Sequence, residues 1–305
     1  TSACIVVEEL AKVDGACANT VAHHQAGMCC FMDGANEVQK EKYLPKIGRG
    51  DYLVGFAMTE PNSGSDAFSL KTRATMEGEE YVINGGKCFI SNGGITDLYV
   101  LFTITAFLVE KETRGLIVGK NENKMGFRAS PTRELTFDNM RVPKENLLGK
   151  IGKGWELVLQ SLTETRVLVA AMALGIAQGA MEAAISYAKQ REQFGQPIIN
   201  FQGVSFMLAD MAIQVECARA LIYKLAAMVD QGERKLHYYA SVAKCFASDM
   251  AMKVTTDAVQ VLGGYGYTSE FPVEKMMRDA KATQIIEGTN QIQRIQIMRS
   301  LMKMY

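Results

Sequence analysis

The chain has 305 residues, a length typical of about two domains, and its 33 basic and 33 acidic side chains cancel. This balance, without a long basic run, argues against nucleic-acid binding, and 48% hydrophobic with 22% charged residues is typical of an ordinary globular protein. Seven scattered cysteines without a CxxC pair, and only three histidines, argue against a zinc site and indicate buried thiols in a reducing compartment.

Residues 1–50 are predicted to be helical, with a turn near 14–18. Thr1 already falls within the first helical pattern, and no Met precedes it. We therefore expect the start of this domain, and any targeting peptide, to lie outside the sequence. No uninterrupted apolar run approaches the roughly 20 residues that span a bilayer, so we expect no membrane segment.

Residues 51–150 change to short alternating runs, which predict a β-domain. Asn84, Gly85 and Gly86 lie between two such runs and are typical of a β-hairpin turn. Further short strands are predicted in the stretches LYVLFTIT, AFLVEK, GLIVG and RELTF.

Residues 151–305 have a helical pattern. Trp155, Val158, Leu159 and Leu162 have the spacing of one helical face, and this helix is predicted to reach Gln190. Further helices are predicted over 204–229, 238–262, 272–285 and 290–304. Long amphipathic helices with short links indicate a four-helix bundle. The fold class is therefore an α+β multidomain protein, with a helical domain over 1–50, a β-domain over 51–150 and a helical bundle over 151–305.

A single carboxylate lies in a predicted turn near the C-terminus. The segment RDAKATQIIEGTNQIQR, residues 278–294, has a helical pattern up to Ile286. The pattern breaks at Glu287 and Gly288, and either Thr289 or Asn290 can cap a second helix, with Gln293 three residues after Asn290. An acid in a tight apolar turn is a competent proton acceptor, although an isolated Glu-Gly pair is more often a surface turn.

These seventeen residues resemble the C-terminal signature of the acyl-CoA dehydrogenase family. The resemblance implies that Glu287 is the base that removes the α-proton of an acyl-CoA thioester. It also implies the acyl-CoA dehydrogenase fold, whose three-domain order matches the order predicted above. Relative to this family the connection at Thr105 and Ala106 is short, and we expect a loop to be missing there.

The segment FAMTEPNSGSD, residues 56–66, is a second point of resemblance, although by itself it indicates only a strand followed by a polar loop. In the family this pattern lines the flavin of FAD, where preorganised donors stabilise the charge of the reduced ring. The FAD contacts that it implies are Phe56, Met58, Thr59, Gly64 and Ser65. Ser65 is also implied to reach the CoA substrate.

The resemblance also implies flavin contacts at Phe89, Ile90 and Ser91, with the aromatic ring packed on the flavin and the hydroxyl near N5. Many relatives have Trp in place of Phe89, and the smaller ring leaves the exposure of the flavin open. Without the resemblance, the three residues indicate only the alternating pattern of a half-buried strand.

Two helix ends are implied to supply further FAD contacts from a neighbouring subunit. Arg191 lies at a helix corner, where its guanidinium fork suits a pyrophosphate. Gly263 and Gly264 end a helix instead of joining a strand to a helix, so they are not a Rossmann fingerprint. His237 lies where the family has a polar FAD contact, but a lone histidine is more often structural. The contacts implied for these ends and for the C-terminal motif are Arg191, Gln193, Phe194, Gln202, Gln260, Gly263, Gly264, Thr289 and Gln291.

Substrate contacts are implied for Thr163, Arg166 and Gly288. Arg166 is either an exposed helical charge or, by the resemblance, the residue that steadies the catalytic turn. Some branched-chain and long-chain relatives carry their catalytic glutamate at the position of Thr165, so this chain follows the short- and medium-chain arrangement. Glu164 lies about 100° around the helix from Thr165 and is expected to point elsewhere.

His23, His24 and Gln25 lie in a stretch that borders the acyl cavity in the family, where apolar residues are usual. The stretch is either an ordinary helix end or surface loop, or a cavity floor with polar donors. The second interpretation predicts a preference for short or polar-tailed acyl-CoA over unbranched chains of eight or more carbons, because each unpaired donor costs about 1–3 kcal/mol.

Together, the motifs predict an FAD-dependent acyl-CoA dehydrogenase that forms a trans-2-enoyl-CoA. Glu287 takes the α-proton, the β-hydride passes to flavin N5, and the Glu287 backbone N–H with a flavin ribityl hydroxyl binds the thioester oxygen. Electrons are expected to pass to an electron-transfer flavoprotein. A homotetramer, a dimer of dimers, is expected because the FAD site draws on two subunits. The expected location is the bacterial cytoplasm, or the mitochondrial matrix in a eukaryote.

Two alternatives remain open at this point. The same fold can act as an acyl-CoA oxidase that uses O₂, or as an enoyl-CoA reductase. A flavin-containing nucleic-acid-binding protein of this fold is the other alternative, and the charge balance with Glu287 retained argues against it. We expect no metal, nucleic acid or membrane among the partners.

Overall fold

The computed structural model describes residues 1–233 and 236–305. By their contacts these residues group into two units. The helical unit comprises Thr1–Asn19, Lys124–Ala129 and Thr163–Tyr305, and the sheet unit comprises Thr20–Asn123 and Ser130–Leu162. The three-domain boundaries expected from the sequence stay a prediction.

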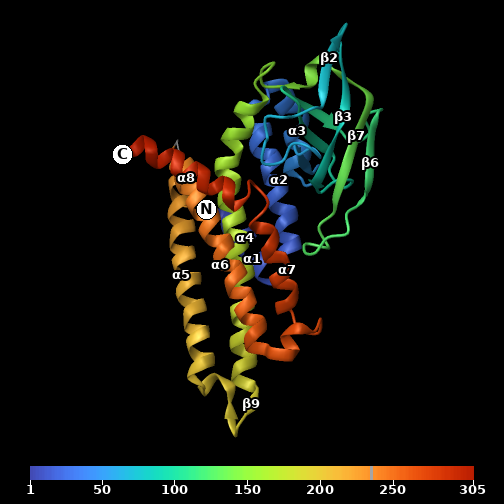
Figure 1. Cartoon of the computed structure of the whole chain (residues 1–305). Helices are drawn as coiled ribbons and strands as arrows, with labels where there is room; N and C mark the ends of the chain where they lie inside the picture. The colour runs from blue at the N-terminus through green and yellow to red at the C-terminus, as the bar shows by residue number, and fades with distance from the viewer. Residues whose placement is uncertain (234–235) are drawn as a thin grey trace. The chain divides into compact units, whose positions relative to one another are not determined.

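The helical unit contains long helices that lie side by side (Figure 1). Helix α6 is central, because α5, α7 and α8 all pack against it. The helices that contribute to this unit are α1 (Ser2–Val13), the start of α2 (Gly15–Gly34), most of α4 (Gly154–Gln190), α5 (Gln202–Asp230), α6 (His237–Leu262), α7 (Val273–Thr283) and α8 (Asn290–Met304). The predicted helices therefore match the observed ones to within a few residues.

Helix α4 is long and apolar enough to cross a membrane by length and composition alone, which the count of uninterrupted apolar runs did not predict. An 18-residue window of it has a mean hydropathy of 1.6. Of that window, 78% is buried within the protein, as is usual for the core helix of a globular protein.

The sheet unit contains two four-stranded sheets together with the end of α2 and with α3 (Glu37–Gly48). The first sheet has the order β1 (Val54–Ala57), β4 (Leu98–Phe102), β5 (Ala106–Glu110) and β8 (Leu147–Leu148), with β1 parallel to β4. The second is antiparallel, in the order β2 (Arg73–Glu77), β3 (Glu80–Ser91), β7 (Thr132–Pro143) and β6 (Leu116–Asn121). The predicted β-domain is thus present as two sheets.

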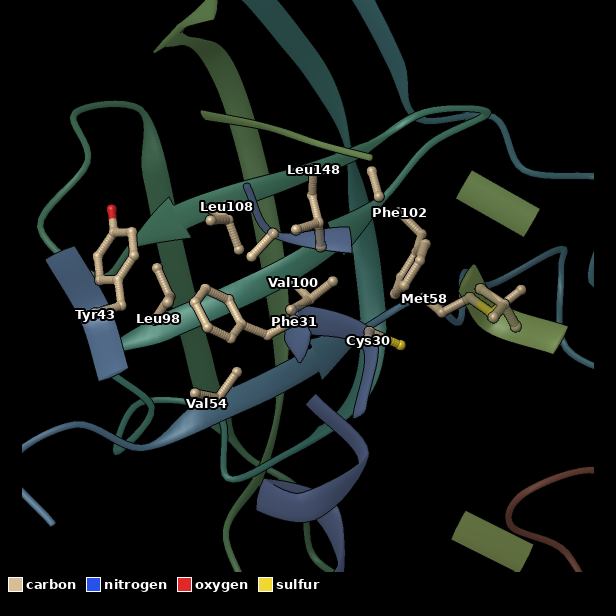
Figure 2. Close-up of a cluster of buried hydrophobic side chains, with 13 residues drawn as sticks. Cys30, Phe31, Tyr43, Val54, Met58, Leu98, Val100, Phe102, Leu108 and Leu148 are labelled. Atoms are coloured by element: carbon tan, nitrogen blue, oxygen red, sulfur yellow. The ribbon is translucent and has the colours of Figure 1, made fainter. Parts of the chain in front are cut away.

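A core of aromatic and aliphatic side chains holds α2 and α3 on the first sheet (Figure 2). Phe31 of α2 and Tyr43 of α3 meet edge to face with ring centroids 6.1 Å apart, a favourable aromatic geometry. Val100 and Phe102 of β4 line the same core, and Met58 lies beside Phe102 at one end of it. The segment that follows β1 therefore begins with a residue, Met58, that is packed in this core.

The predicted hairpin at Asn84–Gly86 is wrong, because β3 runs straight through these residues. Gly85 has φ 142°, and a Cβ there would lie 2.7 Å from the Thr72 Cα. The glycine is needed for this close approach and for the register shift of the strand, not for a chain reversal. The reversal comes earlier, where Gly78 with φ 64° joins β2 to β3.

The connection between β4 and β5 closes as a tight turn of three residues. Phe102 pairs with Ala106, and the Thr103 N–H donates to the Thr105 carbonyl at 2.8 Å. The two expected strands are therefore separate, and the sequence as it stands joins them without a longer loop.

Two further expectations need correction. Residues 23–32 are not a surface loop, since they form the C-terminal part of α2, which ends at Gly34. The link 191–202 is not a plain turn but contains a small hairpin of β9 (Glu192–Gln193) and β10 (Gln196–Pro197), in which Phe194 and Gly195 adopt positive φ. Both differences arise because local patterns do not reveal which backbone groups find partners.

Candidate active site

Glu287 lies in a turn between α7 and α8, as the sequence predicts, and its backbone is left-handed with φ 54°. Gly288 follows with φ 85°. The Thr289 side chain caps α8 by accepting from the Ile292 N–H at 3.3 Å, so Thr289 and not Asn290 is the N-cap. A left-handed conformation is costly for a residue with a Cβ and marks a functional candidate when the surroundings impose it.

Three side chains hold Glu287. The Thr165 hydroxyl donates to the carboxylate Oε2 at 3.0 Å. Arg166 Nε donates to the Glu287 carbonyl at 3.3 Å, and Gln293 Nε2 donates to the same carbonyl at 3.0 Å. Burial lowers the pKa of Arg166, and the Glu287 charge opposes that shift. Arg166 is therefore a buried partner of the turn and not an exposed helical charge.

The backbone N–H of Glu287 remains available to a ligand, because no acceptor for it occurs within residues 1–233 and 236–305. Gln293 was expected to complete a capping box with Asn290. It donates instead to the carbonyls of Glu287 and Gly288, at 3.0 and 2.8 Å. The turn thus directs its carbonyls inward, while this N–H stays unpaired.

Thr163 and His237 form one polar contact, with Thr163 Oγ1 and His237 Nδ1 2.7 Å apart. Burial, with a smaller contribution from Arg166, lowers the pKa of His237. This contact joins α4 to the start of α6. It agrees with a structural role for His237, the more usual role of a lone histidine. Glu164, next along α4, is exposed.

The two segments expected to contact flavin lie side by side in the sheet unit. The Cys88 N–H donates to the Thr59 carbonyl at 2.9 Å, which joins the loop after β1 to β3. Thr59, Ser65 and Ser91 are at least partly exposed. Thr59 and Ser91 thereby present hydroxyl donors from two segments that a backbone hydrogen bond joins.

Some side chains of these segments face the protein and not a ligand. Met58 and Ile90 are buried in the two cores of the sheet unit, and Phe56 packs on Phe102 with centroids 5.0 Å apart. Phe89 has φ 56° at a register shift of β3 and is 65% exposed, so its ring is accessible. The buried side chains of Met58 and Ile90 are therefore not open to a flavin contact.

A buried ion pair fastens this region. Lys87 Nζ donates to the Met58 carbonyl at 2.8 Å and to Glu60 Oε1 at 2.6 Å. Glu60 also accepts from the backbone N–H groups of Lys71 and Thr72, at 2.6 and 3.1 Å. Burial lowers the pKa of Lys87 to about 8 against the opposing effect of Glu60. The pair holds the loop after β1 against β3.

A cavity of about 450 Å³ in the helical unit gathers several of the expected FAD residues. Arg191 lies in it with its guanidinium 5.8 Å from the centre of the Tyr265 ring, and forms no ion pair in the described part of the chain. Gly263 and Gly264 have no atom within 4 Å of an added Cβ, so a ligand can approach their backbone. The lining residues are Tyr187, Arg191, Gln193, Ile198, Val261, Leu262, Gly263, Gly264, Tyr265 and Thr268.

The cavity does not include every expected contact. Phe194, Gln202 and Gln260 lie outside its lining and are exposed, as is Gln291 on α8. Tyr187 and Tyr265 are lining residues that the sequence analysis missed, although Tyr265 directly follows the predicted glycine turn. An unpaired guanidinium beside open glycine backbone fits the pyrophosphate of FAD.

Lys244 is another residue that the sequence analysis missed. It lies fully buried on α6, and its ammonium donates to the Gly288 carbonyl and to Asn290 Oδ1, both at 2.9 Å. The available signal was a lysine on a helix face otherwise made of Ala240, Ala247 and Ala251.

His24 has a partner that the acyl-cavity hypothesis did not foresee. Its Nδ1 accepts from the Val54 N–H at 3.0 Å, and burial lowers its pKa. The ring therefore fastens α2 to the start of β1. Nδ1 of His24 is thus paired within the protein, and the place of this stretch at an acyl cavity stays a prediction.

The helical unit thus holds a glutamate in a left-handed turn, and the sheet unit holds segments suited to a flavin, features typical of a flavoprotein oxidoreductase. Family models for the N-terminal, middle and C-terminal domains of acyl-CoA dehydrogenases match residues 1–51, 55–140 and 152–302. The chain belongs to the acyl-CoA dehydrogenase family. Members of the family are FAD-dependent, and the chain is accordingly an FAD-dependent oxidoreductase.

Relatives support this over nearly the whole chain. A probable acyl-CoA dehydrogenase of Mycobacterium tuberculosis, FadE25, is 46% identical over 98% of this chain and 80% of its own length. The butyryl-CoA dehydrogenase structure from Megasphaera elsdenii is 45% identical with a TM-score of 0.96, over 98% of this chain and 81% of that one. A chain solved in work on the electron transferring flavoprotein of Acidaminococcus fermentans is 46% identical with a TM-score of 0.95, over 98% and 81%.

Proposed function

We propose that Glu287 is the general base of an acyl-CoA dehydrogenase reaction in this chain. The observation that supports the proposal is the turn itself, in which a left-handed Glu287 is held through its carboxylate by Thr165 and through its carbonyl by Arg166. A positioned base typically contributes about 10²–10⁴ in rate. Strain that the surroundings maintain is the usual mark of such preorganisation.

The proposed reaction removes two hydrogens from adjacent carbons of the acyl chain. Glu287 takes the α-hydrogen as a proton, the electron pair of that bond becomes the new double bond, and the β-hydrogen departs with its own pair. Bound FAD would supply the hydride acceptor for this step. The Glu287 backbone N–H donates to the thioester oxygen, where negative charge develops. The product is a trans-2-enoyl-CoA.

Arg191 is proposed to hold the FAD pyrophosphate, with the backbone of Gly263 and Gly264 beside it. Thr59, Ser65 and Ser91 are the hydroxyls proposed to hold the flavin end, because they lie on the two joined segments of the sheet unit. In the family the pyrophosphate contact comes from a neighbouring subunit, so the proposed assembly is a homotetramer. Light scattering of the FAD-loaded protein measures this directly, and a monomer that keeps FAD would contradict it.

Glu287→Gln tests the base. Glutamine keeps the size and hydrogen bonding of the side chain but cannot take the proton. The variant is expected to keep yellow FAD and bind acyl-CoA, while anaerobic flavin reduction slows by at least about 10². Bleaching at a near wild-type rate would show that Glu287 is not the base.

We infer a short acyl chain as the preferred substrate. The support is the similarity to the butyryl-CoA dehydrogenase of Megasphaera elsdenii, together with the polar character of His23 and Gln25 on α2. Comparison of kcat/KM for butyryl-CoA, octanoyl-CoA and an aryl-acyl-CoA with one acceptor is the test, and octanoyl-CoA as the clear best substrate would reject the inference.

The electrons are proposed to pass to an electron-transfer flavoprotein. The support is the similarity to the chain from work on such a flavoprotein in Acidaminococcus fermentans. Stopped-flow reoxidation of the substrate-reduced enzyme should be much faster with that acceptor than with O₂. Faster reoxidation by O₂ would favour the oxidase alternative.

A further inference from the structure

Lys244 is a charged group buried in the helical unit for which the reaction described above has no use. Its side chain is fully buried on α6, and no carboxylate within the described residues lies close enough to form an ion pair with it. Burial lowers the pKa of Lys244 to about 8, and Glu287 is the largest opposing influence. A buried ammonium without a direct counter-ion costs stability unless its hydrogen bonds compensate.

Both hydrogen bonds of Lys244 go to the turn that carries Glu287. The ammonium donates to the Gly288 carbonyl at 2.9 Å and to Asn290 Oδ1 at 2.9 Å. The first acceptor directly follows Glu287, and the second begins α8. Lys244 therefore holds the turn and the first residue of the next helix from one position on α6.

Asn290 itself donates hydrogen bonds to side chains of α6. Its Nδ2 donates to the Ser248 hydroxyl at 2.9 Å and to Asp249 Oδ1 at 2.7 Å. Lys244, Ser248 and Asp249 all lie on α6, so Asn290 is held from three side chains of one helix. The start of α8 is thus fixed on α6 while the Glu287 turn arches between α7 and α8 (Figure 1).

Three donors converge on two carbonyl groups of the turn. Arg166 reaches the Glu287 carbonyl, Gln293 reaches both, and Lys244 reaches the Gly288 carbonyl. These carbonyls must stay turned inward for Glu287 to keep φ 54° and for its N–H to stay unpaired. Of the three donors, Lys244 is the one that also binds the side chain beginning α8.

We propose that Lys244 is a positioning residue for the Glu287 base, which it keeps in reach of the substrate α-carbon by holding the Gly288 carbonyl and Asn290. The inference rests on the proposed function of Glu287. Without the ammonium, the turn can relax toward a right-handed backbone, and the carboxylate then moves away from its working place. A displacement of about 1 Å can cost about 10² in rate, so the effect should appear in the proton-transfer step and not in binding.

The experiment compares Lys244→Met with Lys244→Gln, and uses Lys253→Met as the matched control. Lys253 lies on the same helix, but it is exposed and pairs with Asp257 at 2.5 Å. Methionine keeps the length of the side chain without donating, whereas glutamine still donates. All variants are purified with FAD, and flavin content and melting temperature are recorded first.

The first readout isolates proton removal from hydride transfer. Acetyl-CoA has α-hydrogens but no β-carbon, so in deuterated water its α-exchange, followed by NMR, reports the base alone. We expect exchange to fall by about 10² in Lys244→Met and by about tenfold in Lys244→Gln, with Lys253→Met unchanged. The dissociation constant for butyryl-CoA should change by less than about threefold, so the loss appears in kcat and not in KM.

The second readout needs no reaction. Backbone hydrogen exchange of the peptide 284–293, measured by mass spectrometry, should become faster in Lys244→Met and stay unchanged in Lys253→Met. If Lys244→Met does not accumulate as a folded protein, Lys244→Gln carries both readouts alone. A folded variant with α-exchange within twofold of the wild type, or with unaltered exchange of peptide 284–293, overturns the proposal.

The Glu287→Gln variant distinguishes a failure of the role given to Lys244 from a failure of the proposed function. Loss of α-exchange in Glu287→Gln with normal α-exchange in Lys244→Met rejects the role of Lys244 and leaves the base in place. Normal α-exchange in Glu287→Gln rejects the proposed function and, with it, the role given to Lys244.

Discussion

The Thr165 hydroxyl donates a hydrogen bond to Glu287 Oε2 at 3.0 Å, joining α4 to the turn between α7 and α8 across 122 residues of sequence. Thr165 is 2% exposed and Glu287 is half-buried, so this bond is partly shielded from water. A donor to one carboxylate oxygen selects one orientation of the carboxylate. We therefore expect Thr165, the residue directly after the exposed Glu164, to affect the rate at which the proposed base works.

Thr165→Val removes that donor with little change of shape. We expect the limiting rate of flavin reduction to fall by about tenfold, because the carboxylate loses its fixed orientation. Thr165→Ser keeps the hydroxyl and serves as the control. An unchanged rate of flavin reduction in Thr165→Val would mean that the bond has no kinetic role.

Arg191→Ala should release FAD, because the cavity loses the cation proposed to face the pyrophosphate. Arg191→Lys should recover only part of the affinity, since an ammonium lacks the bidentate fork. The ratio of flavin to protein after gel filtration is the measurement, and subunit association should weaken in parallel. Arg299→Ala, an exposed charge on α8, is the control. Full FAD retention in Arg191→Ala would leave Arg191 as a simple helix-end charge.

His24→Leu should destabilise the protein by about 1–3 kcal/mol, because the buried Val54 N–H loses its acceptor. Burial in the folded protein lowers the pKa of His24 below its usual 6.5, so its stabilising effect is complete above pH 6.5 and is lost as the pH falls from 6.5 through the lower folded pKa. The gap between wild type and His24→Leu in urea should therefore be larger at pH 7.5 than at pH 5.5. A gap independent of pH would contradict this account.

Lys87→Met should destabilise the sheet unit by about 3–5 kcal/mol, because Glu60 is left as an unpaired buried charge. FAD binding should weaken as well, since Lys87 also holds the Met58 carbonyl beside the segment expected to contact flavin. The double variant Lys87→Met with Glu60→Gln should recover part of the stability. Lys253→Met breaks only an exposed pair and should cost at most about 1 kcal/mol. Equal unfolding midpoints for Lys87→Met and Lys253→Met would reject the expected difference between a buried and an exposed ion pair.

Much of the fold could be predicted from the sequence because its signals are local. Helical periodicity marks α4, α5, α6 and α8 to within a few residues, since one face of each helix must be apolar. The Glu287-Gly288 break predicts the turn, because a glycine accepts a left-handed backbone at little cost. The same reasoning failed at Gly85, where a glycine that permits close approach to Thr72 has the same local pattern as a hairpin turn.

The partners of the site residues were decided by the tertiary structure alone. Thr165 and Lys244 lie far from Glu287 in sequence, yet both bind the Glu287 turn. Likewise, His24 meets the Val54 N–H because α2 packs against the start of β1, and no spacing in the sequence encodes that contact. The sequence alone determined which residue types the chain supplies and where its helices and turns begin. Which donor reaches which acceptor depends on packing, because a buried polar group binds whatever partner the folded chain brings within about 3 Å.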